Sequence, residues 1–166
     1  MEKFLLAIDN VSQKTGEIVS LLIFPIIAFV VYEVIMRYFF RSPTEWVFET
    51  SLFLFGAMMI IGGCYVLKER RHVNMDVLYS RLPLRTRALL DVITAPIFFA
   101  FSGVLLIESV KMMWESWAMR VHSESPWGPP LYPVVTTIPI GALLLLLQGV
   151  AKFIRDLRVV VSGRSK

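Results

Sequence analysis

Residues that bind metals or form disulfides are scarce in this 166-residue sequence. It has one cysteine, Cys64, which excludes an intrachain disulfide and a cysteine-based metal cluster. It also lacks the HExxH and CxxC spacings of metal sites and any glycine-rich phosphate loop. The two histidines, His72 and His122, fall in different connections between the long apolar segments described below. If these segments cross a membrane, the histidines lie on opposite faces of it and cannot share a metal. We therefore expect no metal, no cofactor and no enzyme activity in this chain.

Charged residues are also few, at 18% of the sequence, whereas 56% of the residues are hydrophobic. The mean hydropathy is +0.65. The apolar residues gather in four long segments, residues 18–40, 46–67, 89–113 and 133–153. A helix rises about 1.5 Å per residue, so each segment can cross a hydrocarbon core of about 30 Å. The sequence therefore predicts an all-α integral membrane protein, a single domain of four transmembrane helices without a soluble catalytic domain.

Positive charge is distributed unevenly among the connections between these segments. Of the 17 Lys and Arg residues, 13 precede the first segment, join the second to the third, or follow the fourth. The other four are Arg37, Arg41, Lys111 and Arg120. Cytoplasmic connections of membrane proteins collect Lys and Arg, so both termini and the middle loop are predicted to be cytoplasmic. Anionic lipid headgroups account for basic residues at span ends, so nucleic acid is not an expected partner.

The first 16 residues do not have the pattern of a cleaved signal peptide, because two acidic and two basic side chains interrupt them. The first span is therefore expected to remain as an anchor. Phe4, Leu5, Ile8 and Val11 fall at helical spacing. This spacing is compatible with a short helix on the inner membrane surface or with an amphipathic turn in water.

Three ionisable residues lie within the predicted first hairpin. Glu33 and Arg37 are four residues apart and share one face of a helix, and Glu49 lies less than one turn inside the second span, counted from Trp46. The turn between the spans is short, so Arg37 and Glu49 should lie at similar depths. We expect an Arg37–Glu49 bridge with Glu33 as a second partner. The alternatives are that Arg37 extends to the outer interface and that Glu33 contacts another helix or subunit.

Residues 114–132, between the third and fourth spans, are rich in Pro, Trp and Ser. Prolines such as Pro130 restrict the backbone and favour an ordered, extended segment at the membrane interface. Trp114, Trp117 and Trp127 are expected to anchor this segment at the level of the headgroups.

Small residues mark the second segment at Gly56, Gly62, Gly63 and Cys64. Such residues favour close helix packing, either within the chain or against another protein. The sequence has no internal repeat, so a transporter built from two halves of this chain is not indicated.

Several short motifs occur in order along the chain. They are RYFF at 37–40, Trp46 and Glu49 as W-x-x-E, RHVNMD at 71–76, and PIG at 139–141. Together with the four-span plan, their order and spacing resemble the small membrane subunit of tripartite ATP-independent periplasmic (TRAP) transporters, the DctQ-type family. The resemblance covers about residues 31–148.

The resemblance implies a multi-pass protein of the bacterial inner membrane that forms a heterodimer with a much larger membrane subunit. In such transporters the large subunit holds the substrate and sodium sites, and a periplasmic binding protein delivers an organic acid. The small subunit is then a non-catalytic brace for a sodium symporter.

The same resemblance assigns roles to individual residues. Trp46 and Glu49 would fix the outer end of the first hairpin. Arg71, His72 and Asp76 would organise the inner loop, where a helical turn brings His72 and Asp76 together. That pair fits a local cap or headgroup contact as well as partner recognition. The segment with the tryptophans would contact a periplasmic protein or simply anchor at the interface.

The alternative function is a self-sufficient small transporter or channel, built as an oligomer of this chain. Such a protein needs a polar stripe along one helix. The spans offer only Glu33, Ser20, Thr94, Ser102 and scattered hydroxyls. We therefore favour the subunit over the oligomer.

Overall fold

The computed structural model describes residues 2–69 and 83–162, and these residues are helical apart from their connections. The helices are α1 (Glu2–Ser20), α2 (Ile23–Tyr38), α3 (Glu45–Lys68), α5 (Leu84–Ala118), α6 (Tyr132–Val135) and α7 (Thr137–Ser162). Four stretches are long and apolar enough to cross a membrane: Glu2–Tyr38, Glu45–Lys68, Thr86–Ala118 and Tyr132–Val161. The predicted all-α fold with four spans is confirmed, while the side on which the termini lie stays a prediction.

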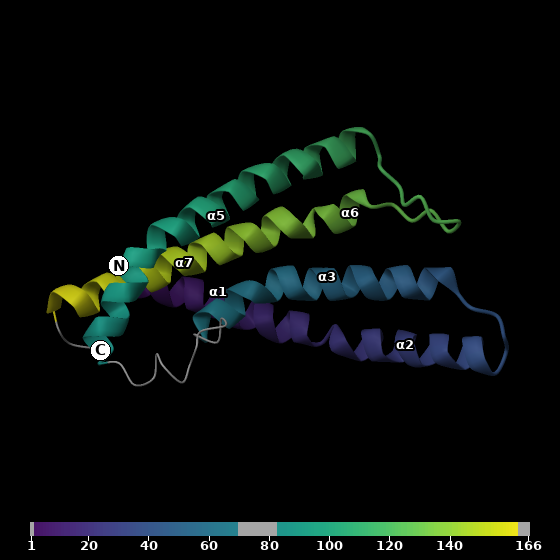
Figure 1. Ribbon diagram of the computed structural model, residues 1–166, viewed down its shortest axis with the longest axis horizontal. Coiled ribbons are helices and arrows are strands. Elements are labelled where there is room, and N and C mark those ends of the chain that lie inside the picture. The colour runs from purple at the N-terminus through teal and green to yellow at the C-terminus, as the bar shows by residue number, and fades with distance from the viewer. Residues whose placement is uncertain (1, 70–82, 163–166) are drawn as a thin grey trace.

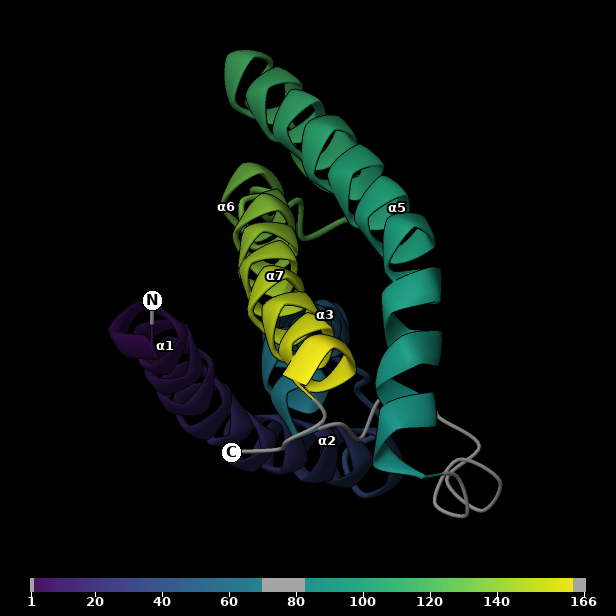
Figure 2. The ribbon, with the colours of Figure 1, turned by 90° about the vertical axis from the view of Figure 1, so that its left-hand side faces the viewer.

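The helices form an elongated bundle built from two antiparallel pairs, α2 with α3 and α5 with α7 (Figure 1). α7 contacts α1, α3 and α5 and lies between α1 and α5 (Figure 2). We call the end with the α2–α3 turn and residues 119–131 the hairpin end. The opposite end, where α1 begins and α7 ends, is the terminal end (Figure 1).

The predicted first span is not one continuous helix, because the chain turns at Leu21 and Leu22. Their amides bond the carbonyls three residues back, those of Ile18 and Val19, at 3.2 and 3.0 Å. Pro25 explains the position of the break: its ring clashes with the carbonyl four residues earlier in a regular helix, which is that of Leu21. α1 thus becomes a separate helix that packs on α3 and α7.

α1 faces the bundle with one apolar stripe. Leu5 and Ile8 are buried in a cluster with Ala151 of α7, whereas Phe4 and Val11 are exposed. The predicted helical spacing is therefore present, but only half of the four named residues point into the protein. The contacts with α3 and α7 make α1 part of the bundle.

The third span continues past its predicted end at residue 113 and stops at Ala118. Glu108 and Lys111 pair at 2.7 Å on its exposed face. Ser102, Ser109 and Ser116 recur every seven residues and are buried. Small side chains at this interval let a neighbouring helix approach closely, and α7 is the main neighbour of α5.

α3 and α7 approach each other closely at Gly141. A Cβ atom there would lie 2.7 Å from the carbonyl oxygen of Ile60, so only glycine fits. Gly56 and Gly62, for which sequence suggested close packing, have no neighbour within 4 Å of such an atom. Cys64, named from the sequence with these glycines, is fully buried.

Candidate functional site at the hairpin end

Glu33 ties α2 to the start of α3. Its side chain accepts hydrogen bonds from Arg37 Nη2 at 2.8 Å and Nε at 3.2 Å. Its second oxygen accepts from the backbone N–H of Thr44 at 3.0 Å and from the Thr44 hydroxyl. Thr44 immediately precedes α3, so one carboxylate satisfies a basic side chain and closes the helical hairpin. These contacts within its own hairpin account for the burial of Glu33 (9% exposed).

The expected Arg37–Glu49 bridge is wrong. Arg37 pairs with Glu33, its neighbour one helical turn away. Glu49 lies on a face of α3 that is directed away from Arg37. It accepts hydrogen bonds from the hydroxyls of Ser123 and Ser125, at 2.6 and 3.0 Å. The rotation of α3 about its axis directs Glu49 to the α5–α6 connection and not to Arg37.

Trp46 closes the apolar side of the same hairpin. Its ring lies 6.0 Å from that of Phe29, in an edge-on arrangement, and 6.0 Å from that of Tyr32. Aromatic pairs at this separation add to the free energy gained by burying their surface. Trp46 therefore fixes α2 against α3, whereas Glu49 fixes a different segment.

The segment held by Glu49 is a narrow loop that doubles back on itself. The amide of Ser123 donates to the carbonyl of Pro129 at 2.9 Å, and that of Leu131 donates to Val121 at 2.9 Å. At the tip, Gly128 has a φ of +59°, and its amide donates to the Ser125 hydroxyl at 3.2 Å. The loop is ordered, as its prolines predicted, but it is folded rather than extended.

The tryptophans and Pro130 occupy different environments around this loop. Trp117 donates from Nε1 to the Thr136 hydroxyl at 2.9 Å and packs 4.7 Å from the Tyr132 ring, joining α5 to α6. Trp114, Trp127 and Pro130 are exposed. Trp127 lies beside Gly128 at the loop tip. An aromatic ring is therefore exposed on a loop whose serines are bonded to Glu49.

A second polar cluster, which sequence reasoning missed, joins α1 to α7 near the terminal end. The Ser12 hydroxyl donates to Gln148 Oε1 at 2.8 Å, and Gln148 Nε2 donates to Asp9 Oδ1 at 3.1 Å. Arg155 donates to Asp9 Oδ2 at 2.5 Å. Ser12 and Gln148 are each only 1% exposed. The one available signal was a glutamine that directly follows the Leu143–Leu147 run.

A neighbouring contact, between Lys68 of α3 and Gln13, also holds α1 in place. In the described residues, no three His, Cys, Asp or Glu side chains gather as metal ligands. Arg71, His72 and Asp76, predicted to organise the inner loop, lie outside the described residues, so their roles stay predictions.

Comparison with known proteins identifies the family. Residues 26–159 match the family described as tripartite ATP-independent periplasmic transporters, DctQ component. The chain belongs to this family. It is thus a small permease component of a TRAP transporter, a multi-pass protein of the bacterial inner membrane. The matched range includes Glu33, Trp46, Glu49 and the hairpin-end loop but not the first 25 residues, which contain α1.

A relative supports the assignment over a shorter stretch. The C4-dicarboxylate TRAP transporter small permease protein DctQ of Vibrio cholerae is 36% identical over 84 residues. These residues make up 51% of this chain but 34% of the relative, so the similarity covers about a third of that protein's length.

Proposed function

We propose that this DctQ-family chain is a non-catalytic brace for the large membrane subunit of a sodium-driven TRAP transporter of organic acids. The observation that carries the proposal is that two carboxylates of the first hairpin bond to other residues of this same chain. Glu33 and Glu49, two of the acidic residues of the first hairpin, accept hydrogen bonds from Arg37, Thr44 and two serines. They hold the chain together, which is what a scaffold requires.

The outward faces of the helices support the same role. Large apolar side chains on α3, including Phe48, Leu52, Phe55 and Met59, are exposed on the isolated chain. Such a surface fits lipid or the apolar helices of a membrane partner. Close helix packing in membranes relies on small residues. Gly56 is such a residue on α3, and it has open space beside it. The large subunit would cover part of this surface and gain a wider, stiffer footprint in the bilayer.

The distribution of basic residues supports an orientation with the terminal end in the cytoplasm and the hairpin end in the periplasm. In that orientation the loop tip at Trp127 faces the compartment of the binding protein. Contact between this loop and the periplasmic binding protein is part of the proposal. The proposal also assigns the binding of sodium and substrate to the large subunit.

Co-purification tests the bracing role. The chain, tagged and co-expressed with the large subunit of the same transporter, should elute with it as one complex of fixed stoichiometry in mild detergent. Replacing Gly56 by Leu should weaken the complex if that face of α3 is covered, whereas Ile97→Leu on α5 is the control. A chain that elutes only as a homo-oligomer, with no large subunit, contradicts the proposal and favours the self-sufficient transporter.

A further inference from the structure

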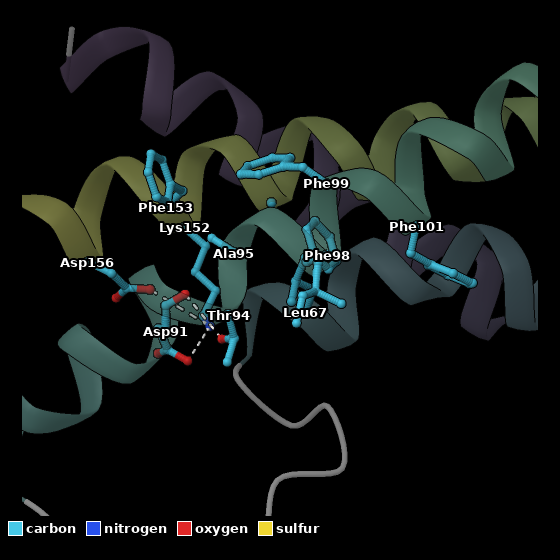
Figure 3. Close-up of a pocket in the computed structure, with 12 residues that line it drawn as sticks. Leu67, Asp91, Thr94, Ala95, Phe98, Phe99, Phe101, Lys152, Phe153 and Asp156 are labelled. Atoms are coloured by element: carbon cyan, nitrogen blue, oxygen red, sulfur yellow. Dashed lines mark hydrogen bonds and ion pairs between the residues drawn. The ribbon is translucent and has the colours of Figure 1, made fainter.

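A cavity of about 520 Å³ lies between α5 and α7 toward the terminal end, bounded by Leu67 of α3 (Figure 3). Its volume is in the range of small-molecule sites in proteins. Most of its wall is apolar, and its aromatic members are Phe98, Phe99, Phe101 and Phe153. Both helices belong to stretches that are long and apolar enough to cross a membrane. In a bilayer the cavity is therefore a hydrocarbon-like space between two spans.

The course of α5 explains why a space remains beside α7. Pro96 lies inside α5, which bends along its length (Figure 2). A proline ring clashes with the carbonyl four residues earlier, so helices kink at this residue. The lining residues of α5 lie on both sides of Pro96, from Asp91 to Phe101. Within this stretch the two helices touch at Gly149, where a Cβ atom would overlap the ring of Phe98.

Ion pairs close one end of the cavity. The Lys152 ammonium lies 3.0 Å from Asp91 Oδ1 and 3.8 Å from Asp156 Oδ2 (Figure 3). Both carboxylates also take part in further interactions, and Asp156 is only 3% exposed. The charges at this end are therefore compensated within the protein. We expect them to select no particular lipid headgroup, so the apolar wall decides what the cavity accepts.

The length and the opening of the cavity fit a single hydrocarbon chain. The ten-residue rise along α5 from Asp91 to Phe101 is about 15 Å, which is about half of a hydrocarbon core of about 30 Å. Ile97 and Phe101 line the cavity and are 74% and 64% exposed, so it opens sideways toward lipid. A helix with its side chains is about 10–12 Å across and cannot pass between two helices that touch at Gly149.

We propose that this cavity holds one acyl chain of a phospholipid from the leaflet at the terminal end, without selecting its headgroup. The chain would enter beside Ile97 and Phe101 and lie along the phenylalanines. An empty space would deprive the lining side chains of van der Waals contacts, and an acyl chain restores them. The proposal depends on the protein spanning the membrane and not on its bracing role, so either can fail without the other.

Native mass spectrometry of the full chain in mild detergent, with equal amounts of phosphatidylethanolamine and phosphatidylglycerol added, tests the proposal. The unaltered chain should retain one phospholipid, with the two kinds bound within about twofold of each other. Ala95→Phe places a ring in the lining and should lower the retained fraction about tenfold, because the ring displaces several methylene groups. Ala100→Phe is the matched control, the same change at an exposed position of α5 outside the lining.

Photolabelling gives a second measurement that does not depend on a variant. A phospholipid with a diazirine midway along one acyl chain, in vesicles that contain the unaltered protein, should label peptides with Phe98 or Phe153 more than the peptide with Phe24. Phe24 is an exposed residue of α2 outside the cavity and reports ordinary lipid contact. Ala95→Phe, checked for unchanged helical circular dichroism, should lower the first labelling and leave the second unchanged.

Four results would each overturn the proposal. A tenfold preference for one headgroup would show that the polar end binds the lipid. Equal retention by Ala95→Phe and Ala100→Phe, or equal labelling of Phe98 and Phe24, would show that only surrounding lipid is present. Loss of the phospholipid when the large subunit binds would show that side chains of that partner fill the cavity.

Discussion

The two ends of the bundle are held by different chemistry. At the hairpin end, carboxylates accept from an arginine and from the hydroxyls of connecting segments, as Glu33 does from Thr44 and Glu49 from Ser123. At the terminal end, Gln148 and Asp9 join helices that are far apart in sequence. The Ser12–Gln148 bond is buried, whereas the Gln148–Asp9 bond and the serine contacts of Glu49 are partly buried. We therefore expect the contacts at the terminal end to contribute more to stability than those at the hairpin end, where the loop depends on a few contacts.

The largest effect is expected from Gln148→Leu, which breaks the terminal end. The change leaves the buried Ser12 hydroxyl without its acceptor and removes one donor from Asp9. Loss of these bonds should lower the free energy of unfolding by about 2 kcal/mol and the Tm by about 6 °C. Thermal unfolding in detergent, followed by circular dichroism, measures the shift.

The single cysteine supplies a local readout for this variant. Cys64 is fully buried on α3, which packs against α1. Detachment of α1 should therefore speed the reaction of the Cys64 thiol with a thiol reagent. Asn10→Leu, at an exposed position of α1, is the control and should leave the labelling rate unchanged. Equal rates for Gln148→Leu and the unaltered chain would refute the idea that this contact holds α1.

A smaller shift is expected from Glu33→Gln, which weakens the hairpin end. An amide cannot provide the charge that Arg37 and the Thr44 amide now contact. The Tm should fall, but by less than for Gln148→Leu, because the Trp46 contacts still join α2 to α3. Glu45→Gln, at an exposed position of α3, serves as the control. A larger fall than that of Gln148→Leu would reverse the proposed ranking of the two ends.

Glu49→Ala should act on the loop with little effect on the whole fold. Without the carboxylate, the hydroxyls of Ser123 and Ser125 lose their acceptor, and the loop amides should exchange with solvent about tenfold faster, since local opening costs less. Hydrogen exchange read by mass spectrometry would follow the loop peptide. Glu124→Gln changes a neighbouring exposed acid and should have no effect. Unchanged protection in Glu49→Ala would mean that the loop holds itself.

The smallest effect is expected from Lys111→Gln. Lys111 and Glu108 pair on an exposed face of α5, with side chains 61% and 62% exposed. Exposed ion pairs contribute little, so the Tm should stay within about 1 °C of the unaltered chain. A fall as large as that of Glu33→Gln would show that this pair is shielded, for example by a partner that remains bound during purification.

The sequence was informative where the physical signal is local. Hydropathy placed the four spans, and the i,i+4 spacing placed Glu33 and Arg37 on one face. The partners of Glu49 were missed because they depend on the rotation of α3 and on the fold of a loop 74 residues later. The Asp9–Gln148 contact was missed for the same reason, because it joins residues 139 apart. The separate α1 was also missed, because its place in the bundle depends on its packing on α3 and α7.

Uptake by proteoliposomes tests the central claim, that this chain supports transport without performing it. Vesicles with the chain alone should take up no organic acid under a sodium gradient. Vesicles that also contain the large subunit, supplied with the binding protein and its substrate, should accumulate that substrate. Solute flux through vesicles that contain this chain alone would contradict the account.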